Sequence, residues 1–90
     1  MEKRQFARIA KALADPRRFE ILKRIASHRE LSCAALRQEF PITPATLSHH
    51  LKELESAGLI ECRRESKYMF LQLHRRVWDS YLKALQKISG

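Results

Sequence analysis

Two thiols and four imidazoles are the side chains of this sequence best suited to metal binding or nucleophilic chemistry. They belong to Cys33, Cys62, His28, His49, His50 and His74. Zinc requires about four such ligands at fixed geometry, and these side chains show no ligand spacing. No nucleophile, base and orienting group recur at spacings useful for catalysis. The sequence therefore predicts no metal site, no cofactor and no enzyme.

The two cysteines have two possible interpretations. Free cysteine is among the most buried residue types, so the simplest expectation is that Cys33 and Cys62 are small apolar residues of the core. A thiol switch is the alternative, and it requires a fold that brings the two sulfur atoms together. The N-terminal segment lacks the apolar stretch of a signal peptide. With two widely spaced cysteines, this favours a reduced, cytoplasmic protein over a secreted disulfide framework.

The charge balance points to a polyanionic partner. Lys and Arg total 18 against 10 Asp and Glu, which gives a net charge of +8. Nucleic acid is the first candidate and an anionic membrane surface the second. The apolar runs are too short to span a bilayer. A chain of 90 residues predicts one domain with a thin core, for which a partner subunit would be a stabilising addition.

Helical periodicity and start signals divide the first part of the chain into four helices. Asp15-Pro16 and Thr43-Pro44 each combine an N-cap side chain with a proline suited to the first turn, and Ser32 is a further N-cap candidate. Gly58 is placed to end the fourth helix in a left-handed conformation. The expected helices cover residues 2–14, 16–28, 32–40 and 43–57.

After Gly58 the apolar period changes. Residues 59–63 and 67–73 predict two strands joined by a polar loop at residues 64–66. Residues 77–88 then carry the apolar stripe of a last helix. A short turn between the third and fourth helices, followed by a hairpin, is the pattern of a winged helix-turn-helix. The expected fold is thus mainly α with a small β-hairpin, in the order α-α-α-α-β-β-α.

Three segments of the chain carry the motifs of a known family. Residues 13–22 (LADPRRFEIL) and residues 43–54 (TPATLSHHLKEL) resemble the opening motif and the recognition helix of the ArsR/SmtB-type family of bacterial transcriptional repressors. Ala57-Gly58-Leu59-Ile60, with the basic residues after it, resembles the entry to the family's wing. The resemblance covers about residues 5–75 without a gap. It implies that residues 1–90 form a single winged helix-turn-helix DNA-binding domain.

The resemblance further implies a homodimer that binds a two-fold operator in double-stranded DNA as a repressor. The first and last helices would pair the two protomers. The alternative is that their apolar stripes only cover the core of the same chain. The candidate interface residues are Phe6, Ile9, Leu13, Trp78, Tyr81, Leu82, Leu85 and Ile88.

A recognition helix enters the major groove by its N-terminal part, so exposed residues there face base edges. The wing at about residues 59–73 would reach the minor groove or its flanking phosphates, unless it is only a solvated charged hairpin. The family often has arginine at the position of His49 and a longer polar residue at that of Pro44, so this chain lacks the usual guanine reader. The candidate DNA contacts are Thr43, Pro44, Ala45, Thr46, Ser48, His49, His50, Lys52, Arg63, Arg64, Lys67 and Tyr68.

Two residues in these motifs have alternative roles. His50 could contact DNA or pack against the turn. Arg18 could contact a phosphate or form an internal ion pair.

The metal-sensing motifs of the family are interrupted in this sequence. Ser32 and Ala34 stand at the two positions of its Cys-x-Cys motif, and Asp79-Ser80-Tyr81 lacks the histidine of its Asp-x-His motif. A residue one step along a helix is rotated by about 100°, so Cys33 cannot simply replace either ligand. The resemblance therefore does not extend to the family's metal-sensing motifs. A protein-interaction adaptor and a metal- or thiol-responsive sensor with non-standard ligands are the alternative functions.

Overall fold

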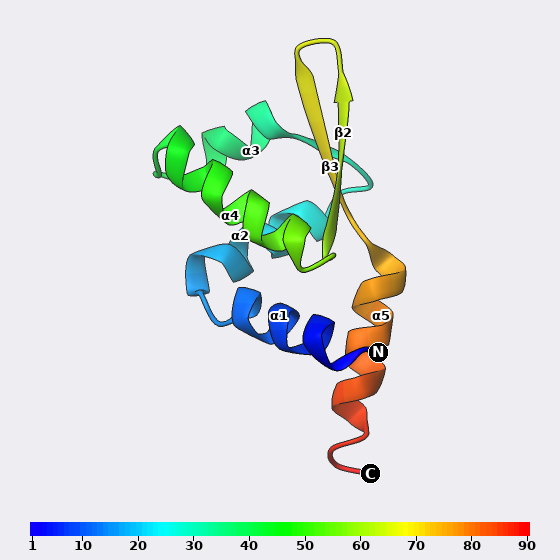
Figure 1. Ribbon diagram of the computed structural model, residues 1–90. Coiled ribbons are helices and arrows are strands. Elements are labelled where there is room, and N and C mark those ends of the chain that lie inside the picture. The colour runs from blue at the N-terminus through cyan, green and yellow to red at the C-terminus, as the bar shows by residue number, and fades with distance from the viewer.

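The computed structural model contains five helices and a small antiparallel sheet, and it describes all residues from Met1 to Gly90. The order of elements confirms a mainly α winged helix-turn-helix fold (Figure 1). The helices are α1 (Lys3–Leu13), α2 (Pro16–Ala26), α3 (Cys33–Glu39), α4 (Pro44–Ser56) and α5 (Arg75–Gln86). The strands are β1 (Leu31–Ser32), β2 (Ile60–Glu65) and β3 (Tyr68–Leu73).

The predicted N-caps position three of the helices. The carboxylate of Asp15 accepts the backbone N–H of Arg18 at 2.9 Å at the start of α2. The hydroxyl oxygens of Ser32 and Thr43 accept backbone N–H groups three residues on, both at 3.1 Å. Each bond satisfies one of the N–H groups that a helix start leaves without a partner. Thr43 thereby fixes the point where the turn from α3 leads into α4, and Ser32 fixes the start of α3.

The sheet differs from the predicted two-stranded hairpin. A third strand, β1, pairs with β3, so that the strand order is β1-β3-β2. Two residues are too few to show an alternating pattern, which is why the sequence gives no signal for β1. The hairpin turn is also shorter than predicted, because Glu65 pairs with Tyr68 and only two residues lie between them. Ser66 adopts a φ of 57° in this turn.

The core lies between α1, α2, α4 and the sheet. Its completely buried side chains include Ile9, Ile21, Leu54 and Leu71, one from each of these elements. The β2–β3 hairpin extends from this core at one end of the molecule, and α5 crosses the N-terminal part of α1 at the other (Figure 1). The molecule is accordingly elongated, with extents of 44 × 23 × 21 Å. No helix has both the length and the apolar character needed to cross a membrane.

Candidate nucleic-acid interface

The first half of α4 presents a short polar face to solvent. Thr43, Ala45, Ser48 and His49 are exposed, whereas Leu47 and Leu51 point into the core. Proline at the first helical position adds no donor, because Pro44 has no backbone N–H. Lys52 continues the exposed face one turn after Ser48. This face is free to approach the edges of bases in a major groove.

The two threonines at the start of α4 are linked to each other. The Thr43 hydroxyl accepts the backbone N–H of Thr46 and donates to the Thr46 hydroxyl oxygen at 2.9 Å. Both side chains remain exposed. They hold the start of α4 in place and remain accessible to a ligand from solvent.

His50 lies on the opposite side of α4 and is only 7% exposed. Its Nδ1 accepts a hydrogen bond from Nε–H of Arg18 at 3.3 Å. Of the two roles considered for His50, the structure therefore favours packing and disfavours contact with DNA. Arg18 likewise makes internal hydrogen bonds, although its partner is an imidazole and not the carboxylate of an ion pair.

The basic residues of the wing differ in whether carboxylates of the same chain pair with them, and Arg63 is the paired one. The guanidinium of Arg63 binds Glu30 at 2.8 Å and Glu65 at 2.6 Å, and it lies 4.7 Å from the ring centroid of Phe70. These carboxylates raise the pKa of Arg63 above its usual range. In turn, the Arg63 hydrogen bond lowers the pKa of Glu30. Arg63 is thus engaged with its own protomer, which argues against the DNA contact expected from the sequence.

Arg64 and Lys67 are the unpaired cations of the wing. Both are exposed, and none of the ion pairs of the molecule includes them or Lys52. Lys67 lies over the ring of the adjacent Tyr68, with its nitrogen 5.7 Å from the ring centroid. Tyr68 is itself 52% exposed. These side chains extend the basic, polar surface from α4 to the tip of the hairpin.

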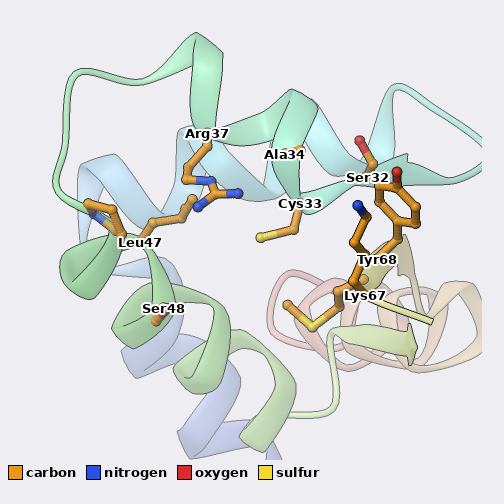
Figure 2. A pocket seen from close by; sticks show the side chains of 10 residues that line it. Ser32, Cys33, Ala34, Arg37, Leu47, Ser48, Lys67 and Tyr68 are labelled. Carbon is orange, nitrogen blue, oxygen red and sulfur yellow. The ribbon is translucent and has the colours of Figure 1, made fainter. Parts of the chain in front are cut away.

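A cavity of about 280 Å³ separates the start of α4 from the wing (Figure 2). Arg37 of α3 reaches into it from one side and Lys67 from the other, with the thiol of Cys33 between them (Figure 2). Ser48 and Tyr68 also line it, so residues from both expected DNA-contacting elements share its wall. Arg37 was not predicted as a site residue, because a single exposed arginine on a short helix carries no sequence signal.

The two cysteines are reduced and half-buried, and both pack against the core. Burial raises the pKa of the Cys62 thiol to about 11, with a further contribution from the Glu55 carboxylate. Because the thiolate is the reactive form, Cys62 is poorly suited to nucleophilic or redox chemistry at neutral pH. The structure brings together no group of three or more His, Cys, Asp and Glu side chains that could hold a metal ion.

An apolar surface lies at the other end of the molecule, on α5 and its C-terminal extension. Leu82 and Leu85 are 39% and 37% exposed, and Ile88 is 78% exposed. Phe6 and Tyr81 pack against each other, with ring centroids 5.1 Å apart, and this contact joins α1 to α5. Trp78 and Leu13 are half-buried. Ile9 is completely buried and so offers no surface to a partner subunit, contrary to expectation. Tyr81 is nearly buried as well.

Comparison with known proteins agrees with this architecture. A family model described as a helix-turn-helix domain matches residues 13–63. The HTH-type transcriptional regulator YceK of Bacillus subtilis (strain 168) is 35% identical over 77 residues, covering 84% of this chain and 77% of YceK. The arsenical resistance operon repressor of Staphylococcus aureus is 32% identical over 89 residues, covering 99% of this chain and 85% of the repressor.

A solved structure supports the same assignment. The solution structure of Mb0332 from Mycobacterium bovis is described as a homodimeric winged helix-turn-helix DNA-binding domain of a possible ArsR-family regulator. It superposes with a TM-score of 0.75 at 31% identity, covering 94% of this chain and 78% of that one. The fold and the exposed polar face of α4 together define a winged helix-turn-helix DNA-binding domain. The chain belongs to the ArsR/SmtB-type family and is a DNA-binding transcriptional regulator.

Proposed function

We propose that this protein is a dimeric repressor that binds a two-fold operator, with α4 in the major groove and the β2–β3 wing beside it. The observation that carries the proposal is the division of α4 into an exposed polar face and a buried apolar face. The unpaired cations of the wing lie beside this face, because Lys67 lines a cavity with Ser48 and Arg64 lines another with Ser48 and Lys52. Major-groove readers of this type place the N-terminal residues of the second helix against base edges.

Each group of candidate residues has a separate role in this proposal. Ser48 and His49 would donate to or accept from base edges, and Ala45 would contact thymine methyl groups. Thr43, Thr46, Lys52 and the wing residues Arg64, Lys67 and Tyr68 would contact the sugar-phosphate backbone and fix the register. Pro44 would pack at the entry of the groove. Without a bidentate guanine reader, the shape of the DNA would contribute to specificity.

The homodimer is supported by two features. The apolar side chains Leu82, Leu85 and Ile88 are exposed on one protomer, and Mb0332 is described as homodimeric. A two-fold protein binds a two-fold site, with half-sites about one helical turn apart. Such a repressor would act in the cytoplasm, where a bacterial chromosome lies.

The test is selection of duplexes from a random-sequence library by the wild-type protein, in EDTA and reductant. We expect an inverted repeat with half-sites spaced by about 10 base pairs. Fluorescence anisotropy should then give a preference of about 10³-fold or more for the selected duplex over a scrambled one at the same salt. Enrichment of no sequence, together with equal and weak binding to both duplexes, would contradict the proposal and favour a partner other than DNA.

A further inference from the structure

A buried imidazole is the exception in an otherwise apolar core. Fifteen of the 16 buried residues are apolar, and the other is His50. It lies on α4 directly after the exposed Ser48 and His49, on the face that Leu47, Leu51 and Leu54 bury. A buried polar side chain requires a hydrogen-bond partner, since an unpaired one destabilises the fold. The position of this partner therefore affects the position and orientation of α4 relative to the other helices.

Arg18 supplies that partner and connects three helices. Its Nε–H donates to Nδ1 of His50 on α4 at 3.3 Å, and its Nη1–H donates to the carbonyl oxygen of Ala12 on α1 at 3.4 Å. Its own backbone N–H donates to the carboxylate of Asp15, the N-cap of α2. The half-buried Arg18 side chain on α2 thus bridges the C-terminal turn of α1 and the middle of α4.

The same helix α1 also holds the C-terminal end of α4. Nε2–H of Gln5 donates to the carbonyl oxygen of Ala57 at 3.4 Å, and Nη1–H of Arg8 donates to that of Ser56 at 3.3 Å. Carbonyl groups at a helix C-terminus lack intrahelical partners, and a cation there is favourable to the helix dipole. Consequently α4 is attached to α1 at its middle through Arg18 and at its end through Gln5 and Arg8.

We propose that Arg18 is a positioning residue for DNA recognition, which acts through His50 by fixing the placement of α4 on α1 and α2 and does not contact DNA. Ser48 and His49 immediately precede His50, so a rotation of α4 about this point moves both base-facing side chains. Base readout depends on hydrogen-bond geometry, whereas phosphate contacts with flexible lysines tolerate small displacements. Loss of the Arg18–His50 bond therefore reduces specific binding more than non-specific binding.

The hydrogen bond requires a neutral His50, because a protonated Nδ1 cannot accept. Burial lowers the pKa of His50, and the charges of Arg18, Arg17 and His49 lower it further. The carboxylate of Asp15 acts in the opposite direction. Neutral His50 therefore carries its proton on Nε2 and keeps Nδ1 available to Arg18.

The experiment compares Arg18→Gln with Arg17→Gln, a control that removes the same charge from the same turn of α2. The Arg17 guanidinium makes no hydrogen bond to α4 and lies 5.8 Å from the ring centroid of Phe40. The probe is the duplex selected by the wild-type protein, with a scrambled duplex beside it, each titrated over a range of salt. We expect Arg18→Gln to weaken specific binding by about tenfold relative to Arg17→Gln, comparable to the loss of one base contact. The salt slope and scrambled-duplex affinity should match those of Arg17→Gln.

A direct phosphate contact by Arg18 would give a different result. Both duplexes would then be weakened equally, and the salt slope would fall by about two for a dimer, one per protomer. That outcome, or equal specific affinity of the two variants, would overturn the proposal.

Variants of His50 separate positioning from loss of folding. His50→Asn keeps an acceptor near the place of Nδ1, whereas His50→Leu removes it and keeps the volume apolar. We expect His50→Leu to reproduce the specific loss, His50→Asn to restore part of it, and Arg18→Gln with His50→Leu to be no weaker than either alone. Circular dichroism must show that every variant is folded. Additive losses in folded proteins would show that Arg18 acts independently of His50 and would overturn the proposal.

Discussion

Arg63 and Arg64 are neighbours on β2, but their surroundings give them different roles. Alternate residues of a strand point to opposite faces, so the two guanidinium groups face different neighbours. Arg63 meets the carboxylates of Glu30 and Glu65, while Arg64 has no acidic partner. The basic composition of the wing could be read from the sequence, but the pairing with Glu30 joins residues 33 positions apart and could not.

Substitution of these two arginines should therefore change different properties. Arg64→Gln should weaken binding to any duplex and reduce the salt slope by about one per protomer, because a phosphate contact is lost. Arg63→Gln should leave the salt slope near that of the wild type and lower the Tm, since it releases the wing from Glu30. Salt-dependent anisotropy and thermal melting measure the two effects. A reduced slope for Arg63→Gln without a change of Tm would contradict this assignment.

His50 should make stability depend on pH in a defined direction. Its pKa in the folded protein lies below the unfolded value of about 6.5, so the unfolded state binds the proton more readily. The stabilisation from neutral His50 is then complete above about pH 6.5 and is lost as the pH falls through the folded pKa. The slope contributed by this residue is at most about 1.4 kcal/mol per pH unit.

The measurement is the free energy of unfolding of the wild type and of His50→Asn, by urea denaturation between about pH 8 and pH 5. The stability advantage of the wild type should shrink toward acid, because only the wild type has this titrating group. An advantage that is constant over the range would contradict a lowered pKa for His50.

At the scale of elements, local signals predicted most of the fold. Asp15, Ser32 and Thr43 cap the helices that they were expected to begin, and Gly58 has the expected left-handed φ of 82°. These features depend on a few adjacent residues and so are visible in sequence. The strand β1 and the burial of His50 depend on distant partners, β3 and Arg18. Periodicity predicts which face of a helix or strand is buried, but it does not show which side chains that face contacts.

Gly58→Ala tests the end of α4. A Cβ at this position would lie 2.7 Å from Nε2 of Gln5, which itself binds the carbonyl group of Ala57. The left-handed backbone alone is unfavourable for alanine by about 1–2 kcal/mol. We expect a loss of unfolding free energy of at least this size in urea denaturation. Gly90→Ala is the control, because a Cβ there meets nothing within 4 Å. Equal stability of the two variants would contradict this role for Gly58.

At the scale of the whole molecule, the two ends of an elongated protomer have different surfaces. The α4 and wing end is polar and basic, whereas α5 has a buried residue only at Tyr81 and leaves Leu82 and Leu85 exposed. Helix α1 connects these ends, because it packs on α5 through Phe6 and holds α4 through Gln5 and Arg8. Any partner subunit seated on α5 would therefore be linked by one helix to the recognition helix.

The proposed dimer leads to a prediction about charge on α5. Leu85→Glu places a carboxylate in the expected interface, where burial without a partner is strongly unfavourable. Lys83→Gln is the control, since it lowers the net charge by the same one unit at an exposed position on α5. Sedimentation equilibrium should show a dimer for the wild type and for Lys83→Gln, and a monomer for Leu85→Glu at the same concentration. The monomer should also lose most of its affinity for the selected two-fold duplex, because one protomer contacts only one half-site. A dimeric Leu85→Glu with wild-type affinity would place the interface elsewhere and leave Leu82, Leu85 and Ile88 without a role in assembly.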